Sequence, residues 1–196
     1  DRERRTLVKL VRTDREYEVR VQDRPWARFS LPQLGSILPE VSVTDAGEGW
    51  QRVRISWQLQ EPIQQDELAI AFHLDLEPDF WWAPHLAPEE NDAIAQHVFR
   101  SPALIVAQGA DTLALVPDLD ICGHNPQTPW FMDLAAPDKT LWIGVSRTEI
   151  VRHVQYRKVG GMRFDTGTFE LGFYVTAYSV PQPSNEQPHN PWARVS

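Results

Sequence analysis

The run ELAIAFHLDL, Glu67–Leu76, decides the fold of this chain. From Leu68 to Leu76 every second residue is large and apolar, and the residues between them are small or polar. A period of two places these five side chains on one face of a strand, whereas a helix of 3.6 residues per turn would spread them around its axis. Burying them contributes on the order of 10 kcal/mol before conformational entropy is subtracted. We therefore predict a long strand near the middle of a sheet.

Two other long runs repeat this alternation, one from Val53 to Leu59 and one from Phe169 to Ala177. A short hairpin is expected near the N-terminus, with strands at Leu7–Val11 and Glu16–Gln22. Turn residues separate the runs, for example at 45–49 (DAGEG). The remaining expected strands are Ala103–Val106, Leu113–Val116, Leu141–Val145 and Ile150–Tyr156.

Helix is nearly absent from this pattern. The one helical candidate is Glu89–His97, which is long enough for only a turn or two. Many turn-separated strands of similar spacing are typical of two-layered antiparallel folds. We predict an all-β chain that forms an antiparallel β-sandwich of about ten strands with little helix.

The predicted sandwich domain covers residues 1–180, and residues 181–196 form a Pro-rich linker or tail. Four prolines stand between Pro181 and Pro191, and prolines at this density favour an extended spacer. We expect a module that is followed by a further domain in a longer protein.

Composition narrows the possible partners. The formal net charge is −8, which disfavours nucleic acid, because phosphate binding needs clustered Lys and Arg. No apolar run reaches the ~18 residues that span a bilayer, so no membrane partner is expected. No signal peptide is recognisable, and the sequence predicts no particular cellular location. Cys122 is the only cysteine, which rules out an intrachain disulfide, and we interpret it as a small buried residue.

A metal site is the first catalytic possibility. His85, His97 and His124, with Asp118 and Asp120, supply ligand types that suit zinc. No two of these histidines have the i, i+2 spacing that points both rings to the same side of a strand, and the HExxH helix pattern is absent. We predict no metal and no other cofactor.

A carboxylate pair is the second possibility. Glu89, Glu90 and Asp92 offer the residue type used in glycoside hydrolysis, where two carboxyl groups flank the scissile bond. Adjacent acids in a Pro-flanked polar segment are explained more simply as a solvated turn. No catalytic residue is predicted.

The aromatic run Phe80-Trp81-Trp82 is the third feature. On a strand, Trp81 points to one face and its two neighbours to the other, so at least one large ring should lie outside the main core. Such a ring can stack on a sugar or pack against another protein. The predicted ligand or domain-contact residues are Trp81, Trp82, His85, His97 and Arg100.

Three segments carry a resemblance: PDFWWAPHLAP at 78–88, QHVFRSPALIV at 96–106 and LALVPDLD at 113–120. Together with the strand pattern they resemble the N-terminal β-sandwich of bacterial multidomain glycosidases or polysaccharide lyases. In those enzymes the sandwich precedes an (α/α)-barrel catalytic domain and packs on it. The resemblance implies a non-catalytic module whose residues Trp81, Trp82, His85 and His97 face the missing C-terminal catalytic domain or an oligo- or polysaccharide.

Two alternative functions stay open. The chain could be a free-standing carbohydrate-binding module, or it could be a small β-sandwich hydrolase or metal-dependent enzyme. The docking module and the free-standing carbohydrate-binding module require different surfaces. A flat apolar patch around the aromatic run favours docking of a domain, whereas open aromatic rings favour a sugar.

Overall fold

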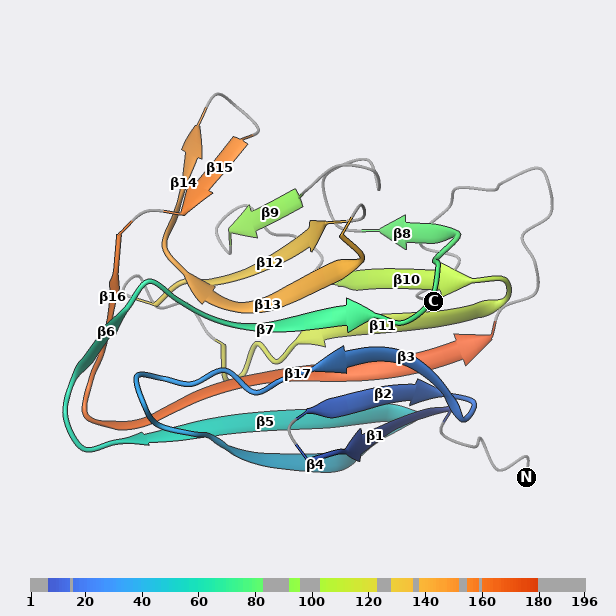
Figure 1. Cartoon of the computed structure of the whole chain (residues 1–196), viewed down its shortest axis with the longest axis horizontal. Helices are drawn as coiled ribbons and strands as arrows, with labels where there is room; N and C mark the ends of the chain where they lie inside the picture. Colours follow the sequence, from blue (N-terminus) through green and yellow to red (C-terminus); the bar gives the residue numbers. More distant parts are fainter. Residues whose placement is uncertain are drawn as a thin grey trace.

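The computed structural model describes residues 7–14, 16–82, 92–95, 103–122, 128–135, 138–151, 155–158 and 160–179. These residues form strands, turns and irregular segments, and none of them is helical. Two large antiparallel sheets are stacked face to face (Figure 1), and the seven-stranded sheet lies in front in that view. The predicted fold class, an antiparallel β-sandwich, is confirmed.

The strands of the seven-stranded sheet, in spatial order, are β1 (Val8–Arg12), β2 (Tyr17–Val21), β3 (Arg24–Phe29), β7 (Glu67–Leu74), β13 (Thr140–Ser146), β12 (Trp130–Ala135) and β9 (Asp92–Ala95). Those of the six-stranded sheet are β4 (Glu40–Gly47), β5 (Trp50–Leu59), β17 (Gly167–Ser179), β11 (Asp111–Pro117), β10 (Leu104–Gln108) and β8 (Phe80–Trp82). Two small ribbons complete the fold: β6 (Ile63–Gln65) with β16 (Met162–Phe164), and β14 (Thr148–Val151) with β15 (Gln155–Lys158).

Strand β7 has the central position that its sequence predicts. It is fourth of seven in its sheet, between β3 and β13. Its alternate residues Leu68, Ile70 and Phe72 are completely buried, because they face the other sheet. The fifth apolar residue of the run, Leu76, lies beyond the end of the strand.

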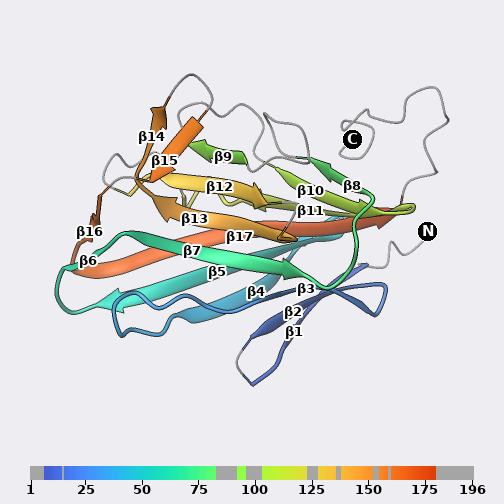
Figure 2. The same ribbon diagram turned by 45° about the horizontal axis from the view of Figure 1, so that its top comes forward.

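Aromatic rings join the two sheets at the centre of the core. Phe173 on β17 meets Phe72 on β7 edge-on, with 5.2 Å between ring centroids, and Phe29 on β3 at 5.8 Å. All three rings are fully buried. The sheets that these rings connect are seen from a second angle in Figure 2.

Two of the sequence predictions are wrong in detail. The helical candidate Glu89–His97 contains strand β9 instead, because Asp92–Ala95 pairs with the edge of the sheet at β12. The expected single strand Ile150–Tyr156 is divided between β14 and β15, in which Ile150 pairs with Tyr156. The other residues of the helical candidate lie outside the described ranges.

The described residues contain seventeen strands rather than about ten. Three of these strands, β6, β8 and β16, have only three residues, which is too short for a period of two to be recognised. The predicted Pro-rich tail, residues 181–196, lies outside the described residues, and so does Val180 before it. The domain boundary at residue 180 therefore stays a prediction.

Candidate functional site

Strand β8 contains the aromatic run, and it pairs with β10 at one edge of the six-stranded sheet. Trp81 is 8% exposed and belongs to the core between the sheets. Phe80 and Trp82 point to the opposite, outer face, where both are half-buried. The predicted alternation is therefore confirmed, and one large ring on each side of Trp81 lies outside the main core.

A second apolar cluster lies on that outer face. At its centre Ala103, Ile105 and Ala114 are buried. The half-buried residues that surround them are Trp50, Phe80, Trp82, Val116 and Tyr178. We call these eight residues the aromatic face.

The register of the strands shows how the aromatic face is built. Trp50 on β5 pairs with Thr176 on β17, and Thr176 pairs with Ala114 on β11. Ala114 pairs with Ile105 on β10, and Ile105 pairs with Trp82 on β8. Paired residues of antiparallel strands share a face, and neighbouring strands are about 4.8 Å apart, so the backbones at Trp50 and Trp82 stand roughly 19 Å apart across four strand spacings. The shorter side chains between them form an apolar floor.

Three described polar side chains beside this floor, Thr176, Arg52 and Asp118, form polar contacts within the chain. The Thr176 hydroxyl donates a hydrogen bond to the carbonyl oxygen of Gly49 at 2.9 Å. Arg52 Nε donates to Asp118 Oδ2 at 2.7 Å, and its guanidinium carbon stands 5.5 Å from the centroid of the Tyr174 ring. The hydrogen bond to Asp118 raises the pKa of the Arg52 guanidinium. Among the described residues, Thr176, Arg52 and Asp118 therefore already have polar partners of their own.

Cys122 lies in the turn that follows β11 and is 6% exposed. Its Sγ stands 3.6 Å from the carbonyl oxygen of Gly172. Burial raises the pKa of the thiol to about 11. A nucleophilic cysteine needs a thiolate, so this residue is not a nucleophile at neutral pH.

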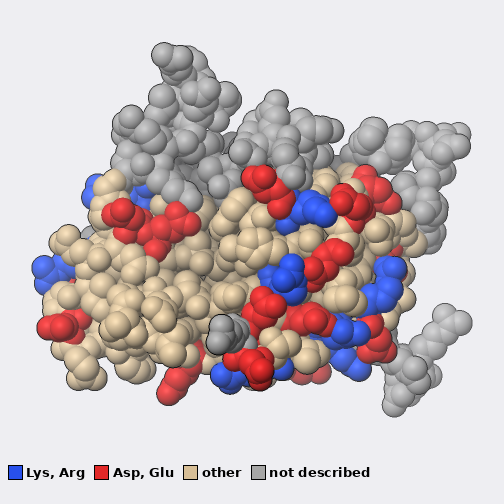
Figure 3. Space-filling model, viewed as in Figure 1, with Lys and Arg blue, Asp and Glu red and all other residues tan. Residues whose placement is uncertain are grey.

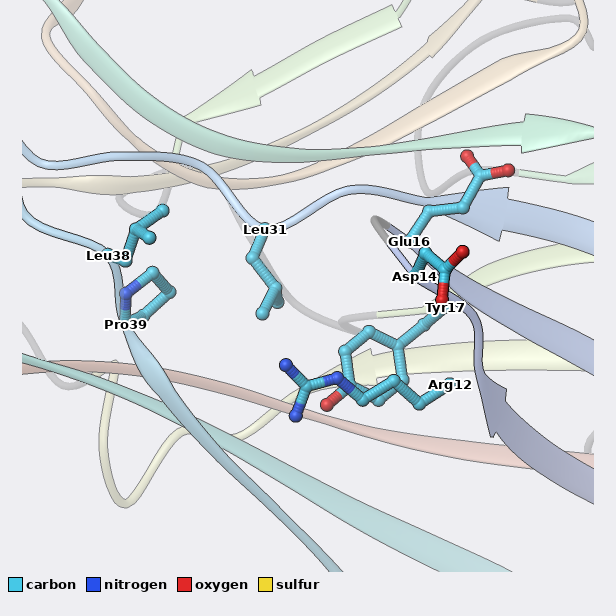
Figure 4. Close-up of a pocket in the computed structure, with 7 residues that line it drawn as sticks. All are labelled: Arg12, Asp14, Glu16, Tyr17, Leu31, Leu38 and Pro39. Carbon is cyan, nitrogen blue, oxygen red and sulfur yellow. The ribbon is translucent and has the colours of Figure 1, made fainter.

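A pocket of about 300 Å³ lies on another part of the molecule, between the β1–β2 hairpin and loop 31–39 (Figure 4). None of the predicted contact residues lines it. Sequence reasoning missed it, because its walls come from segments that are distant in the chain and show no motif.

Three of the five predicted contact residues, His85, His97 and Arg100, lie outside the described residues, as does His124. Within the described ranges, no group of three or more His, Cys, Asp or Glu side chains could hold a metal ion. The same part of the chain contains no helix that is long and apolar enough to cross a membrane.

No protein-family model matches this chain, and no curated protein is recognisably similar to it. The resemblance to the sandwich domains of glycosidases and polysaccharide lyases therefore stays a prediction.

Proposed function

We propose that this chain is a non-catalytic β-sandwich module of a carbohydrate-active enzyme, and that its aromatic face packs against the catalytic domain. The single observation that carries the docking part is the second apolar cluster, which lies on an outer sheet face rather than between the sheets. The carbohydrate part rests on the sequence segments that resemble such modules.

The chemistry of the aromatic face favours a protein surface over a sugar. A saccharide site combines aromatic rings with hydrogen-bond donors and acceptors that bind the hydroxyl groups. Here the central residues Ala103, Ile105 and Ala114 are apolar and buried, and the half-buried residues around them are mostly aromatic. Depletion of charge at the centre, with aromatic residues around it, is typical of the cores of protein–protein interfaces.

Trp82 is the residue of this face best suited to anchor a partner. It is half-buried at the end of the row that crosses the sheet, and tryptophan is enriched among residues that dominate binding energies. Trp81 supports the same contact indirectly, since its ring fills the core beneath β8.

The first test is the reading frame after Ser196. The proposal expects it to continue into a catalytic domain, which can then be produced separately and titrated with this module by calorimetry. Trp82→Glu should weaken the complex at least tenfold, because it places a charge inside a desolvated interface.

Trp142→Glu is the matched control. Trp142 is also a half-buried tryptophan, but it lies on β13 in the other sheet, so its replacement should leave binding unchanged. Equal effects of the two substitutions, or a reading frame that stops at Ser196, would contradict the proposal. Saturable binding of neutral or acidic oligosaccharides to the module alone, lost in Trp82→Glu, would support a free-standing carbohydrate-binding module instead.

A further inference from the structure

The pocket beside the β1–β2 hairpin has one apolar wall. The side chains of Leu31, Leu38 and Pro39 form it, and the ring of Tyr17 closes its inner end. Leu38 is 69% exposed, the highest value among the exposed large hydrophobic residues of the described chain. An exposed leucine at the rim of a cavity is a surface that a ligand can cover.

The opposite wall carries a positive charge. Arg12 is exposed at the end of β1 and lies on the same face of the hairpin as Tyr17, with which it pairs. Figure 4 shows its guanidinium beside the Tyr17 hydroxyl, both directed toward Leu31 and Pro39. The guanidinium carbon stands 6.0 Å from the centroid of the Tyr17 ring.

Arg12 differs from the other arginines of the large sheets. Arg20, Arg24, Arg28, Arg52 and Arg54 are each within 4.0 Å of a carboxylate. Within the described part of the chain, Arg12 has no such ion pair, and the Tyr17 ring is its one charge-related contact. Its charge is thus available to an anion.

The carboxylates of Asp14 and Glu16 also line the pocket, but they lie away from the Arg12 guanidinium. Figure 4 shows Asp14 and Glu16 on the far side of the Tyr17 ring from the guanidinium. The Glu16 carboxylate is 3.9 Å from the guanidinium of Arg28, which balances its charge. The negative charges of Asp14 and Glu16 disfavour a dianion such as a phosphate monoester. Arg12 alone would have to balance both charges of such a ligand.

The surface around the pocket is also charged on the side of the hairpin and uncharged on the side of the loop. Figure 3 shows charged side chains of both signs over β1–β3, whereas the left-hand part of that face is largely uncharged. Loop 31–39 itself contains no charged residue. The pocket therefore joins a charged hairpin to an apolar loop, and an amphipathic ligand matches both.

We propose that this pocket binds a small aliphatic monocarboxylate. Arg12 pairs with the carboxylate, the Tyr17 hydroxyl donates a hydrogen bond to it, and Leu31, Leu38 and Pro39 cover the hydrocarbon chain. A volume of about 300 Å³ is at the lower end of ligand pockets, which suits a molecule of this size. The aliphatic wall argues against a sugar, which would stack on a flat ring.

Calorimetric titration of the purified chain with butanoate, hexanoate and octanoate tests this inference. Affinity should rise about fourfold for each added methylene while the pocket still has room, because each buried methylene contributes a constant increment. Octylamine, which has the same hydrocarbon chain and the opposite charge, should bind at least tenfold more weakly than octanoate.

Two variants locate the site. Arg12→Gln should weaken octanoate binding about tenfold or more, since it removes a charge-assisted contact, and should leave octanol binding unchanged. Leu38→Asp should abolish binding of both, and its high exposure makes a folding defect unexpected. Arg163→Gln, at another exposed arginine, which lies on β16 and does not line the pocket, is the matched control and should have no effect.

The inference is overturned by absence of saturable octanoate binding, by equal binding to Arg12→Gln and the unmodified chain, or by a preference for octylamine. The inference does not depend on the proposed docking function. Trp82→Glu should weaken docking and leave octanoate binding unchanged, whereas Arg12→Gln should do the reverse, so each proposal can fail independently of the other.

Discussion

The thiol of Cys122 can be followed by itself, because the chain contains no other cysteine. Burial raises its pKa from an ordinary value of 9.0 to about 11. Above pH 9 the unfolded chain therefore loses the thiol proton while the folded chain keeps it, and folding becomes less favourable. The contribution of this group to stability is complete below pH 9 and is lost as the pH rises through about 11.

The size of this loss follows from the shift. A difference of about two pKa units corresponds to about 2 to 3 kcal/mol, since one unit is worth 1.36 kcal/mol. Lysine and tyrosine side chains titrate in the same range, so the measurement must be a difference between two proteins. We expect urea unfolding of the unmodified chain to lose this amount between pH 8.5 and pH 11 relative to Cys122→Ala.

A chemical assay gives a second readout of the same group. At pH 8 the folded chain should react with a thiol-specific reagent at least about a hundredfold more slowly than the chain unfolded in urea, because the thiol is both protonated and 6% exposed. Identical pH profiles of the unmodified chain and Cys122→Ala, together with fast labelling in the folded state, would refute the reasoning.

Two further substitutions test the core and one close strand contact. Phe173→Leu removes two edge-on ring contacts and should lower the free energy of unfolding by about 1 to 3 kcal/mol, seen as a fall in Tm of roughly 2 to 4 °C for each kcal/mol. Phe80→Leu, on the half-buried outer face, should lower it by less than about 1 kcal/mol. Equal losses would contradict the assignment of Phe173 to the core. Gly144→Ala places a Cβ 2.5 Å from Ala69 Cα and should cost about 3 kcal/mol in urea unfolding. Gly109→Ala meets open space at a positive φ and should cost about 1 kcal/mol, so a larger loss there than at Gly144 would argue against the close contact.

Much of the architecture could be predicted from local pattern. The alternation in Glu67–Leu76 predicts a central strand, and β7 has that position. The prediction is possible because a strand that buries one face has an apolar residue at every second position. The alternation of Phe80, Trp81 and Trp82 likewise predicts rings on both faces of a strand. These predictions succeed because a strand's period of two is a local property.

Pairing is not a local property, and the wrong predictions are of that kind. Asp92–Ala95 is a strand because the edge of β12 offers it backbone partners, which its own residues do not reveal. Ile150 and Tyr156 look like parts of one strand, yet they face each other across a ribbon.

The candidate sites follow the same division. The chain's own residues determine that Trp82 lies on the side of β8 opposite to Trp81. Only the tertiary structure places it in one row with Trp50, which comes from a strand thirty residues earlier, and only the tertiary structure brings Arg12 opposite Leu38. The physical reason is that alternation depends on the chemistry of neighbouring residues, whereas a surface or a pocket depends on which distant strands share hydrogen bonds.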